Sequence, residues 1–165
     1  MDHTSTETGQ SASAFFPRYL DTLSMVERLH RLLLDVIKDE FERLGIIDIN
    51  SVQALLIFNI GDNEVTAGEL KTRGYYQGSN VSYNLKKLVE ADYMHHQKCN
   101  IDRRAVRVRL TEKGRGICKI VGDLFERHAS TISQKGGVEE HKILELNKTL
   151  RDVERFWTDQ IRYIY

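Results

Sequence analysis

Apolar residues recur every three or four positions through the first part of the chain, the spacing that places them on one face of an α-helix. Between 16 and 44 these residues are Leu20, Leu23, Val26, Leu29, Leu33, Ile37, Phe41 and Leu44. Gly45 follows them, and glycine commonly ends a helix because it adopts left-handed backbone angles without strain. The pattern predicts a long amphipathic helix over 16–44, preceded by a disordered tail rich in Ser, Thr and Gly over 1–14.

Two polar pairs mark the starts of two further helices. Asn50 stands three residues before Gln53, and Thr66 three residues before Glu69, which is the spacing of a capping box. In that motif each side chain bonds to the backbone of the other residue and satisfies N–H groups that a helix start leaves unpaired. We therefore expect an apolar helix after the first box, and after the second a short helix closed by Gly74.

The following segment changes from helical to alternating spacing. Ser79 can cap a helix that runs to about 91, whose inward-facing residues are Val81, Leu85 and Leu88. Beyond 93 the helical period is lost, and over 106–110 valine and leucine alternate with arginine, as in a half-buried strand. Residues 93–98 can pair with that strand, so the sequence predicts a two-stranded antiparallel hairpin with its turn at 100–102.

Two long helices complete the chain, separated by Gly136 and Gly137. The apolar residues of the first are Ile117, Ile120, Val121, Leu124 and Ile132. Those of the second approach a heptad repeat and are Ile143, Leu146, Leu150, Val153, Trp157, Ile161 and Ile164. No other segment is available to cover these faces and that of the N-terminal helix, so we expect an intermolecular bundle in a homodimer. The alternative is that the terminal helices pack over the rest of the same chain.

Length and composition limit the class of protein. A chain of 165 residues with 41% hydrophobic and 29% charged residues can fold without disulfides as one domain, or as a small domain with an oligomerisation element. Its single proline favours long helices. The chain has no run of eighteen apolar residues and no secretory signal at its N-terminus, and its two cysteines fit a reducing compartment. We therefore expect a cytoplasmic protein without a membrane span.

Charge is distributed unevenly along a chain that is neutral overall. The segment 66–115 holds eleven lysines and arginines against five acidic residues, a net charge of +6, and the remainder carries −6. A segregated positive region favours a polyanionic partner, of which nucleic acid is the most common. The alternative is a solvated basic surface without a partner.

The helix that follows Ser79 has the side chains that a reader of DNA bases requires. Its polar stripe consists of Asn80, Tyr83, Asn84 and Lys87. Asparagine can bracket an adenine edge, and tyrosine and lysine can contact a thymine methyl, a guanine or a phosphate. Near the helix N-terminus, Ser79 and Ser82 can donate to phosphates. The alternative is an ordinary solvated helix face.

Two consecutive helices joined by a glycine-containing turn and followed by a basic hairpin are typical of a winged helix-turn-helix. At the turn, Asp102 can orient Arg104, and either Arg104 or Arg103 can enter a minor groove. Arg107 and Arg109 lie on the outward strand face, within reach of phosphates. These arginines can equally protect an exposed edge strand from aggregation, and the two roles are compatible.

The segment from Asp102 to Gly114 resembles the wing signature of the MarR family of transcriptional regulators. That signature is Asp, any residue, Arg, an alternating strand and then Leu-Thr-x-x-Gly. Every fixed position is matched here, by Asp102, Arg104, Leu110, Thr111 and Gly114. Residues 78–89 also resemble the recognition helix of the family. The resemblance covers nearly the whole chain from 16 onward.

The resemblance implies a mainly α fold, a winged helix-turn-helix with a two-stranded β wing and long terminal helices that form a dimerisation bundle. The corresponding regions are a tail over 1–14, a dimerisation helix over 15–49, a DNA-binding lobe over 50–111 and dimerisation helices over 112–165. The partners implied are a pseudo-palindromic double-stranded DNA operator and a second copy of the chain. The expected phosphate contacts are then Ser79, Ser82, Arg73 and Lys86. Arg107 is a further expected DNA contact at the wing.

The family also leads us to expect a small-molecule effector between the dimer helices and the winged lobe. Candidate pocket residues, chosen because their helices should meet there, are Arg18, His30, Leu34, Phe58 and Phe125. No cofactor or metal is expected, because the adjacent His95 and His96 point to opposite faces of a strand. Cys118 and Cys99 are expected to be inert thiols, although Lys98 beside Cys99 can lower its pKa.

An enzyme is not expected, since the sequence has no phosphate-binding glycine loop, nucleophile elbow or zinc-protease motif. The remaining alternatives are a non-specific architectural DNA-binding protein and a winged helix that binds RNA or protein. A large preference for a cognate duplex over random DNA at fixed salt separates the first alternative from a specific regulator.

Overall fold

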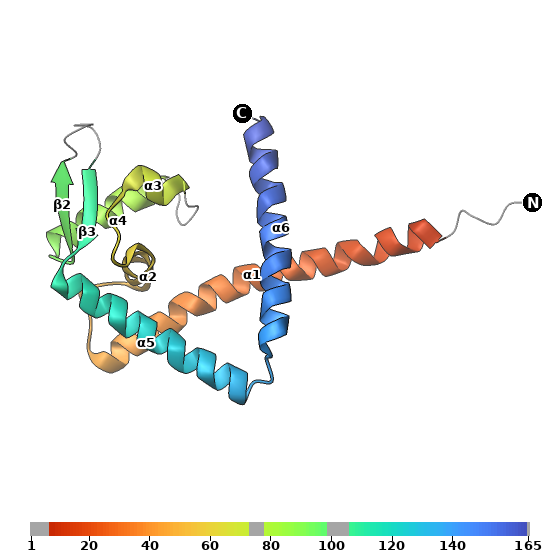
Figure 1. Ribbon diagram of the computed structural model, residues 1–165, viewed down its shortest axis with the longest axis horizontal. Coiled ribbons are helices and arrows are strands. Elements are labelled where there is room, and N and C mark those ends of the chain that lie inside the picture. The colour runs from red at the N-terminus through yellow and green to blue at the C-terminus, as the bar shows by residue number, and fades with distance from the viewer. Residues whose placement is uncertain (1–6, 73–77, 99–105, 165) are drawn as a thin grey trace, which may run out of the picture. The chain divides into compact units, whose positions relative to one another are not determined.

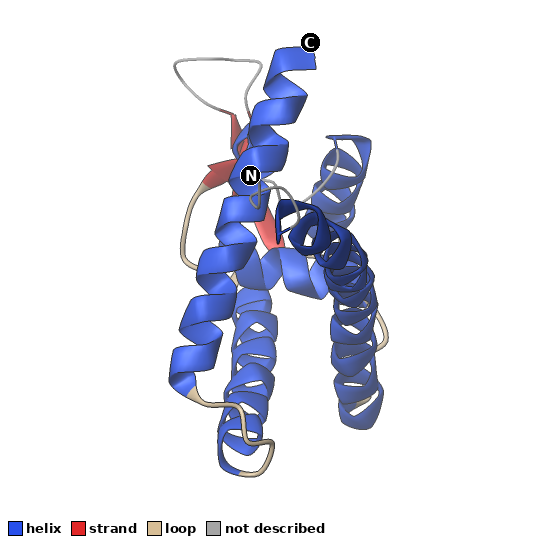
Figure 2. Ribbon diagram, turned by 90° about the vertical axis from the view of Figure 1, so that its right-hand side faces the viewer, coloured by secondary structure: helices blue, strands red, loops and turns tan. Residues whose placement is uncertain are grey.

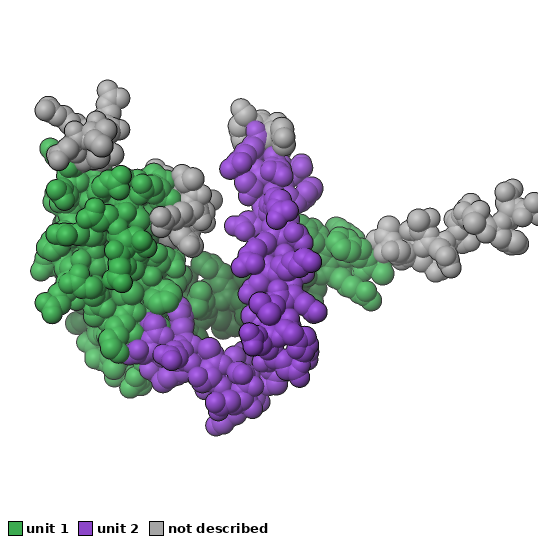
Figure 3. Space-filling model, viewed as in Figure 1, with its two compact units in different colours: residues 1–121 green, residues 122–165 purple. Residues whose placement is uncertain are grey.

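The structure, a computed structural model, describes residues 7–72, 78–98 and 106–164 (Figure 1). Helices make up most of the described chain, and its strands gather in one small sheet (Figure 2). The elements are α1 (Glu7–Leu44), α2 (Ser51–Ile60), β1 (Val65–Thr66), α3 (Ala67–Thr72), α4 (Gly78–Glu90), β2 (Met94–Lys98), β3 (Val106–Leu110), α5 (Glu112–Gln134) and α6 (Glu140–Ile164). The chain divides into two compact units, 1–121 and 122–165, within α5 (Figure 3).

This order of elements confirms the predicted fold class, a mainly helical winged helix-turn-helix with long terminal helices. The first helix is longer than predicted, because α1 begins at Glu7 and takes in residues 7–14 of the segment assigned to a disordered tail. Extending an existing helix requires no new nucleation, so residues of modest helix propensity can continue a helix that tertiary packing stabilises elsewhere.

The sheet of the wing has three antiparallel strands in the order β1-β3-β2, not the two that were predicted. The pairing of β2 with β3 is confirmed, with Met94 opposite Leu110 and His96 opposite Val108. The additional strand is β1, in which Val65 pairs with Val108. A strand of two residues is too short to show alternation, so periodicity alone could not reveal it.

The hydrophobic core of the first unit brings α2 together with α1, α4 and the sheet. α2 is apolar on nearly all sides and contributes buried Ala54, Leu56, Ile57 and Ile60. α4 buries the predicted residues Val81, Leu85 and Leu88, and the sheet buries Val65, Met94, Val108 and Leu110. The core therefore fixes which face of α4 points outward.

The second unit contains the C-terminal part of α5 and all of α6. The break between these helices is confirmed, because α5 ends at Gln134 and Gly137 adopts a positive φ of 65° before α6. The large apolar residues exposed on α6 include Ile143, Leu144, Leu146, Phe156, Trp157 and Ile161. Among the described residues, no helix is long and apolar enough to cross a membrane.

Candidate nucleic-acid interface

The exposed face of α4 holds most of the residues that were predicted to contact DNA. Asn80, Ser82, Tyr83, Lys86 and Lys87 are all exposed, and Tyr83 retains 60% of its accessible surface. The opposite face is buried, so these side chains are presented by a helix anchored in the core. A face with two asparagines, a serine and a tyrosine is rich in the donors and acceptors that base edges and phosphates require.

Asn84 differs from its neighbours because it is half-buried and oriented by another helix. The side-chain amide of Gln53 donates to Oδ1 of Asn84 over 3.3 Å. Gln53 is itself held by the predicted capping box, in which its backbone N–H donates to Asn50 Oδ1 over 2.8 Å and its Oε1 accepts from Asn50 N. The cap of α2 thereby holds the group that donates to Asn84, a link that the sequence analysis did not predict.

Lys87 is positioned by two contacts on α4 itself. Its Nζ lies 5.7 Å from the centre of the Tyr83 ring and 3.4 Å from Glu90 Oε2. Lys86 Nζ approaches Glu90 as well, at 4.0 Å from Oε1. Two lysines therefore share one carboxylate, which leaves a net positive charge at this end of α4.

The wing presents its arginines outward along β3. Arg107 and Arg109 are exposed, whereas Val108 between them and Leu110 after them are buried, as the alternation predicted; Val106, at the start of the strand, is exposed. Arg107 Nη1 lies 4.0 Å from Glu69 Oε1, so this arginine is held loosely over the start of α3. The other predicted contacts, Arg73, Asp102, Arg103 and Arg104, and the side chain of Ser79, lie outside the described residues.

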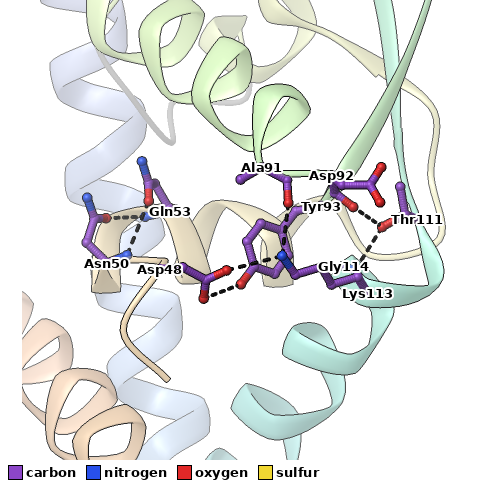
Figure 4. A network of polar contacts seen from close by, with 9 residues as sticks. All are labelled: Asp48, Asn50, Gln53, Ala91, Asp92, Tyr93, Thr111, Lys113 and Gly114. Atoms are coloured by element: carbon purple, nitrogen blue, oxygen red, sulfur yellow. Dashed lines mark hydrogen bonds and ion pairs between the residues drawn. The ribbon is translucent and has the colours of Figure 1, made fainter. Parts of the chain in front are cut away.

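A corner of polar contacts joins the wing to the start of α5 (Figure 4). The hydroxyl of Thr111 donates to the carbonyl of Asp92 over 2.7 Å and accepts from the backbone N–H of Gly114 over 3.1 Å. It therefore caps α5 and ties that helix to the turn before β2, where Asp92 adopts a positive φ of 65°. Gly114 lies so close to this turn that a Cβ would be 2.2 Å from the carbonyl oxygen of Tyr93.

The same corner is anchored to the loop before α2 through Asp48. Tyr93 donates its hydroxyl to Asp48 Oδ1 over 2.7 Å, and Lys113 donates to Asp48 Oδ2 over 3.1 Å (Figure 4). Lys113 also donates to the carbonyl of Ala91 and lies 4.1 Å from the centre of the Tyr93 ring. The hydrogen bond from Tyr93, followed by Lys113, lowers the pKa of Asp48, although partial burial opposes the shift. Burial and the bond to Asp48 raise the pKa of Tyr93.

These contacts give a structural reason for the Leu-Thr-x-x-Gly part of the wing signature. Leu110 is buried, Thr111 caps α5, and Gly114 allows α5 to approach the β2 strand. The motif thus fixes where the wing joins α5. Asp48 and Tyr93 were missed from sequence because they are 45 residues apart and belong to no local motif.

Cys118 is half-buried, and burial together with nearby Asp62 raises the pKa of its thiol. A raised pKa lowers the fraction of reactive thiolate, in agreement with the expectation of an inert thiol. Cys99 lies outside the described residues. Within the described part of the chain, no three His, Cys, Asp or Glu side chains gather as metal ligands.

The residues expected to line an effector pocket are distributed over three helices. Arg18 and His30 are exposed on α1, and Leu34, Phe58 and Phe125 are half-buried. Phe125 belongs to the second unit and the other four to the first. A cavity of about 650 Å³ lies elsewhere, between α3, α4 and the sheet, and none of the five lines it. Their role stays a prediction.

Comparison with known proteins places this fold among transcriptional regulators. Residues 49–114 match a family model described as a winged helix DNA-binding domain. The exopolysaccharide II synthesis transcriptional activator ExpG of Rhizobium meliloti is 34% identical over 146 residues, which are 88% of this chain and 74% of the relative.

Solved structures share the same architecture. The transcriptional regulator SlyA has a TM-score of 0.73 at 18% identity, over 88% of this chain and 99% of its own. A putative MarR family transcriptional regulator from Listeria monocytogenes, solved in complex with 26mer DNA, also has a TM-score of 0.73 at 18% identity, over 86% of this chain and 92% of its own. The chain belongs to the MarR family of winged helix transcriptional regulators, and this is a family of regulators and not of enzymes.

Proposed function

We propose that this chain is a sequence-specific regulator that binds a double-stranded, pseudo-palindromic DNA operator as a homodimer. The observation that carries the proposal is the two-sided character of α4, which buries Val81, Leu85 and Leu88 and exposes a continuous polar face. Such a helix can enter a major groove while its other side remains fixed in the core. The Listeria monocytogenes relative, which has the same fold, was solved with DNA bound.

The residues divide into base readers and phosphate contacts. Asn80, Tyr83, Asn84 and Lys87 read or position in the major groove; Asn84 Oδ1 accepts from Gln53, which leaves its amide N–H groups to donate to a base edge. Phosphate contacts come from Ser79, Ser82, Arg73 and Lys86, and Arg107 flanks the wing. In the wing, Arg104 or Arg103 enters the minor groove, and Asp102 orients Arg104.

The homodimer is supported by the apolar faces of the terminal helices. α1 exposes large apolar residues along much of its length, among them Phe15, Phe16, Leu20, Met25, Val26, Leu29 and Leu32. α6 carries a second such face. So many exposed apolar residues on two helices are typical of an interaction site, and a second copy of the chain would cover them. A small-molecule effector that changes the separation of the two lobes would then alter operator affinity.

Selection of duplexes from a random pool by the full-length protein tests this function. A homodimer with two lobes should enrich an inverted repeat whose half-sites lie about 10 base pairs, or a multiple of that, apart. Enrichment of no sequence, or of a single half-site bound by a monomer, would contradict the proposal.

A matched pair of lysine substitutions tests the placement of DNA on α4. Lys87 and Lys38 are both exposed helix residues paired with a nearby glutamate, Lys87 with Glu90 and Lys38 with Glu42. Lys87→Ala should weaken binding to the selected duplex and lower the slope of log affinity against log salt by about 1, because one phosphate or base contact is lost. Lys38→Ala on α1 should leave both unchanged. Equal effects of the two substitutions would contradict the placement.

A further inference from the structure

The sheet of the wing has one face turned towards the core and one face open to solvent. Val108 and Leu110 point inward and are buried, and α4 lies on that side of the sheet (Figure 1). The outer face of the wing sheet consists of the exposed residues His95 and Gln97 from β2 and Arg107 and Arg109 from β3. They form two cross-strand pairs, His95 with Arg109 and Gln97 with Arg107. The outer face is therefore polar and cationic, and it points away from α4.

Two small hollows lie on this face. The base hollow, of about 180 Å³, lies where β3 meets α5, and its polar lining is His95, Arg109, Thr111 and Arg115. The second hollow, of about 250 Å³, shares His95 and Arg109 with the first and adds Glu64, Gln97 and Arg107. Both hollows are smaller than the roughly 300–1,000 Å³ of a typical small-molecule site, so each suits a single side chain better than a whole ligand.

Positive charge exceeds negative charge around the two hollows. Arg115 reaches the base hollow from the start of α5, where its Nη1 donates to the carbonyl of Leu110 over 3.3 Å. Arg109 lines both hollows, and among the described residues it has no carboxylate within ion-pair distance. Arg107 lies 4.0 Å from Glu69, and Glu64 lines the second hollow. The described surroundings therefore include three arginines and two carboxylates, and the excess of cations favours an anionic partner.

The spacing of the arginines matches that of side chains on an extended acidic segment. Arg107 and Arg109 are two residues apart on one strand, so their side chains leave the outer face about 7 Å apart. Alternate side chains of any extended segment have the same spacing. Guanidinium groups bind carboxylates through charge-assisted and often bidentate hydrogen bonds. A segment with an acidic residue at every second position can therefore place one carboxylate in each hollow as it runs along β3.

We propose that the outer face of the wing sheet docks an extended acidic segment of a partner protein. One carboxylate of the segment lies in the base hollow between Arg109 and Arg115, and the next lies in the second hollow beside Arg107. His95 is three residues from Lys98, where β2 ends, so the base hollow is about 10 Å along the strand from that end. A duplex that takes α4 in its major groove and the wing tip in its minor groove leaves this hollow free. The docking itself requires no DNA.

Docking is tested on the full-length protein without DNA, by fluorescence anisotropy at about 0.15 M salt. The probe is the labelled peptide Thr-Glu-Val-Glu-Val-Glu-Thr, and its neutral control has glutamine at each acidic position. A second control, Thr-Val-Glu-Glu-Glu-Val-Thr, has the same composition with contiguous acidic residues. The alternating peptide should bind with a Kd below about 1 mM, the neutral control about tenfold more weakly and the contiguous control about threefold more weakly. Absence of binding at about 1 mM, or a control that binds as well as the probe, would overturn the proposal.

Charge-matched variants locate the docking surface. Arg109→Gln and Arg115→Gln should each weaken binding of the alternating peptide by about threefold or more, because each removes one guanidinium from the base hollow. Arg31→Gln is the control, since Arg31 is exposed on α1 and lines neither hollow, and it should bind the peptide as the parent does. Glu64→Gln removes a carboxylate from the second hollow and should strengthen binding by about twofold, a gain that a damaged fold would not produce. Parent-like binding by Arg109→Gln and Glu64→Gln would overturn the assignment.

The selected duplex distinguishes an acidic partner segment from DNA as the occupant of this face. Protein saturated with the duplex should bind the alternating peptide within about threefold of the affinity of free protein, because salt screens the phosphates beyond roughly 8 Å. Displacement of the peptide by the duplex would assign the outer face to DNA and overturn the docking of an acidic segment. A parent that binds the peptide but selects no duplex would refute the proposed function alone.

Discussion

Replacement of Gly114 by alanine should disturb the close packing between the wing and the start of α5. A Cβ at this position would lie 2.2 Å from the carbonyl oxygen of Tyr93 and 3.3 Å from Cβ of Leu110. That carbonyl accepts the backbone N–H of Thr111 over 3.0 Å, so it cannot move away without losing the hydrogen bond that starts the strand pairing. The added methyl group must therefore displace α5 from the β2 strand.

The expected magnitude follows from two opposing effects. Alanine in place of glycine within a helix favours folding by about 0.5–1 kcal/mol, because glycine loses more backbone entropy. An overpacked core costs about 1–3 kcal/mol, and the close approach to a fixed carbonyl places Gly114→Ala at the upper end of that range. We expect a net loss of about 2 kcal/mol in the free energy of unfolding.

Gly116 provides the control within the same helix. A Cβ built there meets nothing within 4 Å, so Gly116→Ala should stabilise the protein by about 0.5–1 kcal/mol through propensity alone. Urea denaturation followed by circular dichroism measures both variants, at one protein concentration because association of the proposed homodimer would contribute to stability. Equal unfolding midpoints for the two alanine variants would refute the packing described for this corner.

Three further predictions concern the contacts around the winged lobe. Thr111→Val should lower the free energy of unfolding by about 1–2 kcal/mol in urea denaturation, because α5 loses its cap, and an unchanged midpoint would contradict that role. Asp48 has a lowered pKa, so its contribution to stability is present above about pH 4 and disappears as the pH falls further, towards the folded-state pKa. Urea midpoints measured between pH 3 and pH 6 should therefore fall less steeply for Asp48→Asn than for the parent, and parallel curves would count against the carboxylate network. Gln53→Ala removes the hydrogen bond that orients Asn84, so competition binding should show reduced discrimination among duplexes with an unchanged salt dependence. Full discrimination by this variant would show that the link to Asn84 has no part in recognition.

Local signals in the sequence predicted most of the fold. The capping boxes at Asn50 and Thr66 both form, with their partners Gln53 and Glu69 in reciprocal hydrogen bonds. The alternation around Val108 correctly predicted a strand and its outward arginines. Each of these features depends on residues three or fewer positions apart, so a single sequence contains the whole signal.

Features that depend on distant residues were not predictable in the same way. Val65 joins the sheet by pairing with Val108, more than forty residues later, and its strand is too short to show a period. Gln53 reaches Asn84, and Asp48 reaches Tyr93 and Lys113, only after the core has brought their helices and loops together. The cavity beside α4 is likewise a product of packing, since its lining comes from α3, α4 and all three strands of the sheet.

The proposed role of the exposed face of α4 is to read DNA sequence. Its most direct test is the ratio of affinities for the selected duplex and a scrambled duplex, measured at one salt concentration for the parent and for Asn80→Ala. We expect a ratio of about 10³ or more for the parent, falling by about tenfold or more when Asn80 is replaced. A parent ratio near 1, or a ratio that does not change in Asn80→Ala, would contradict it.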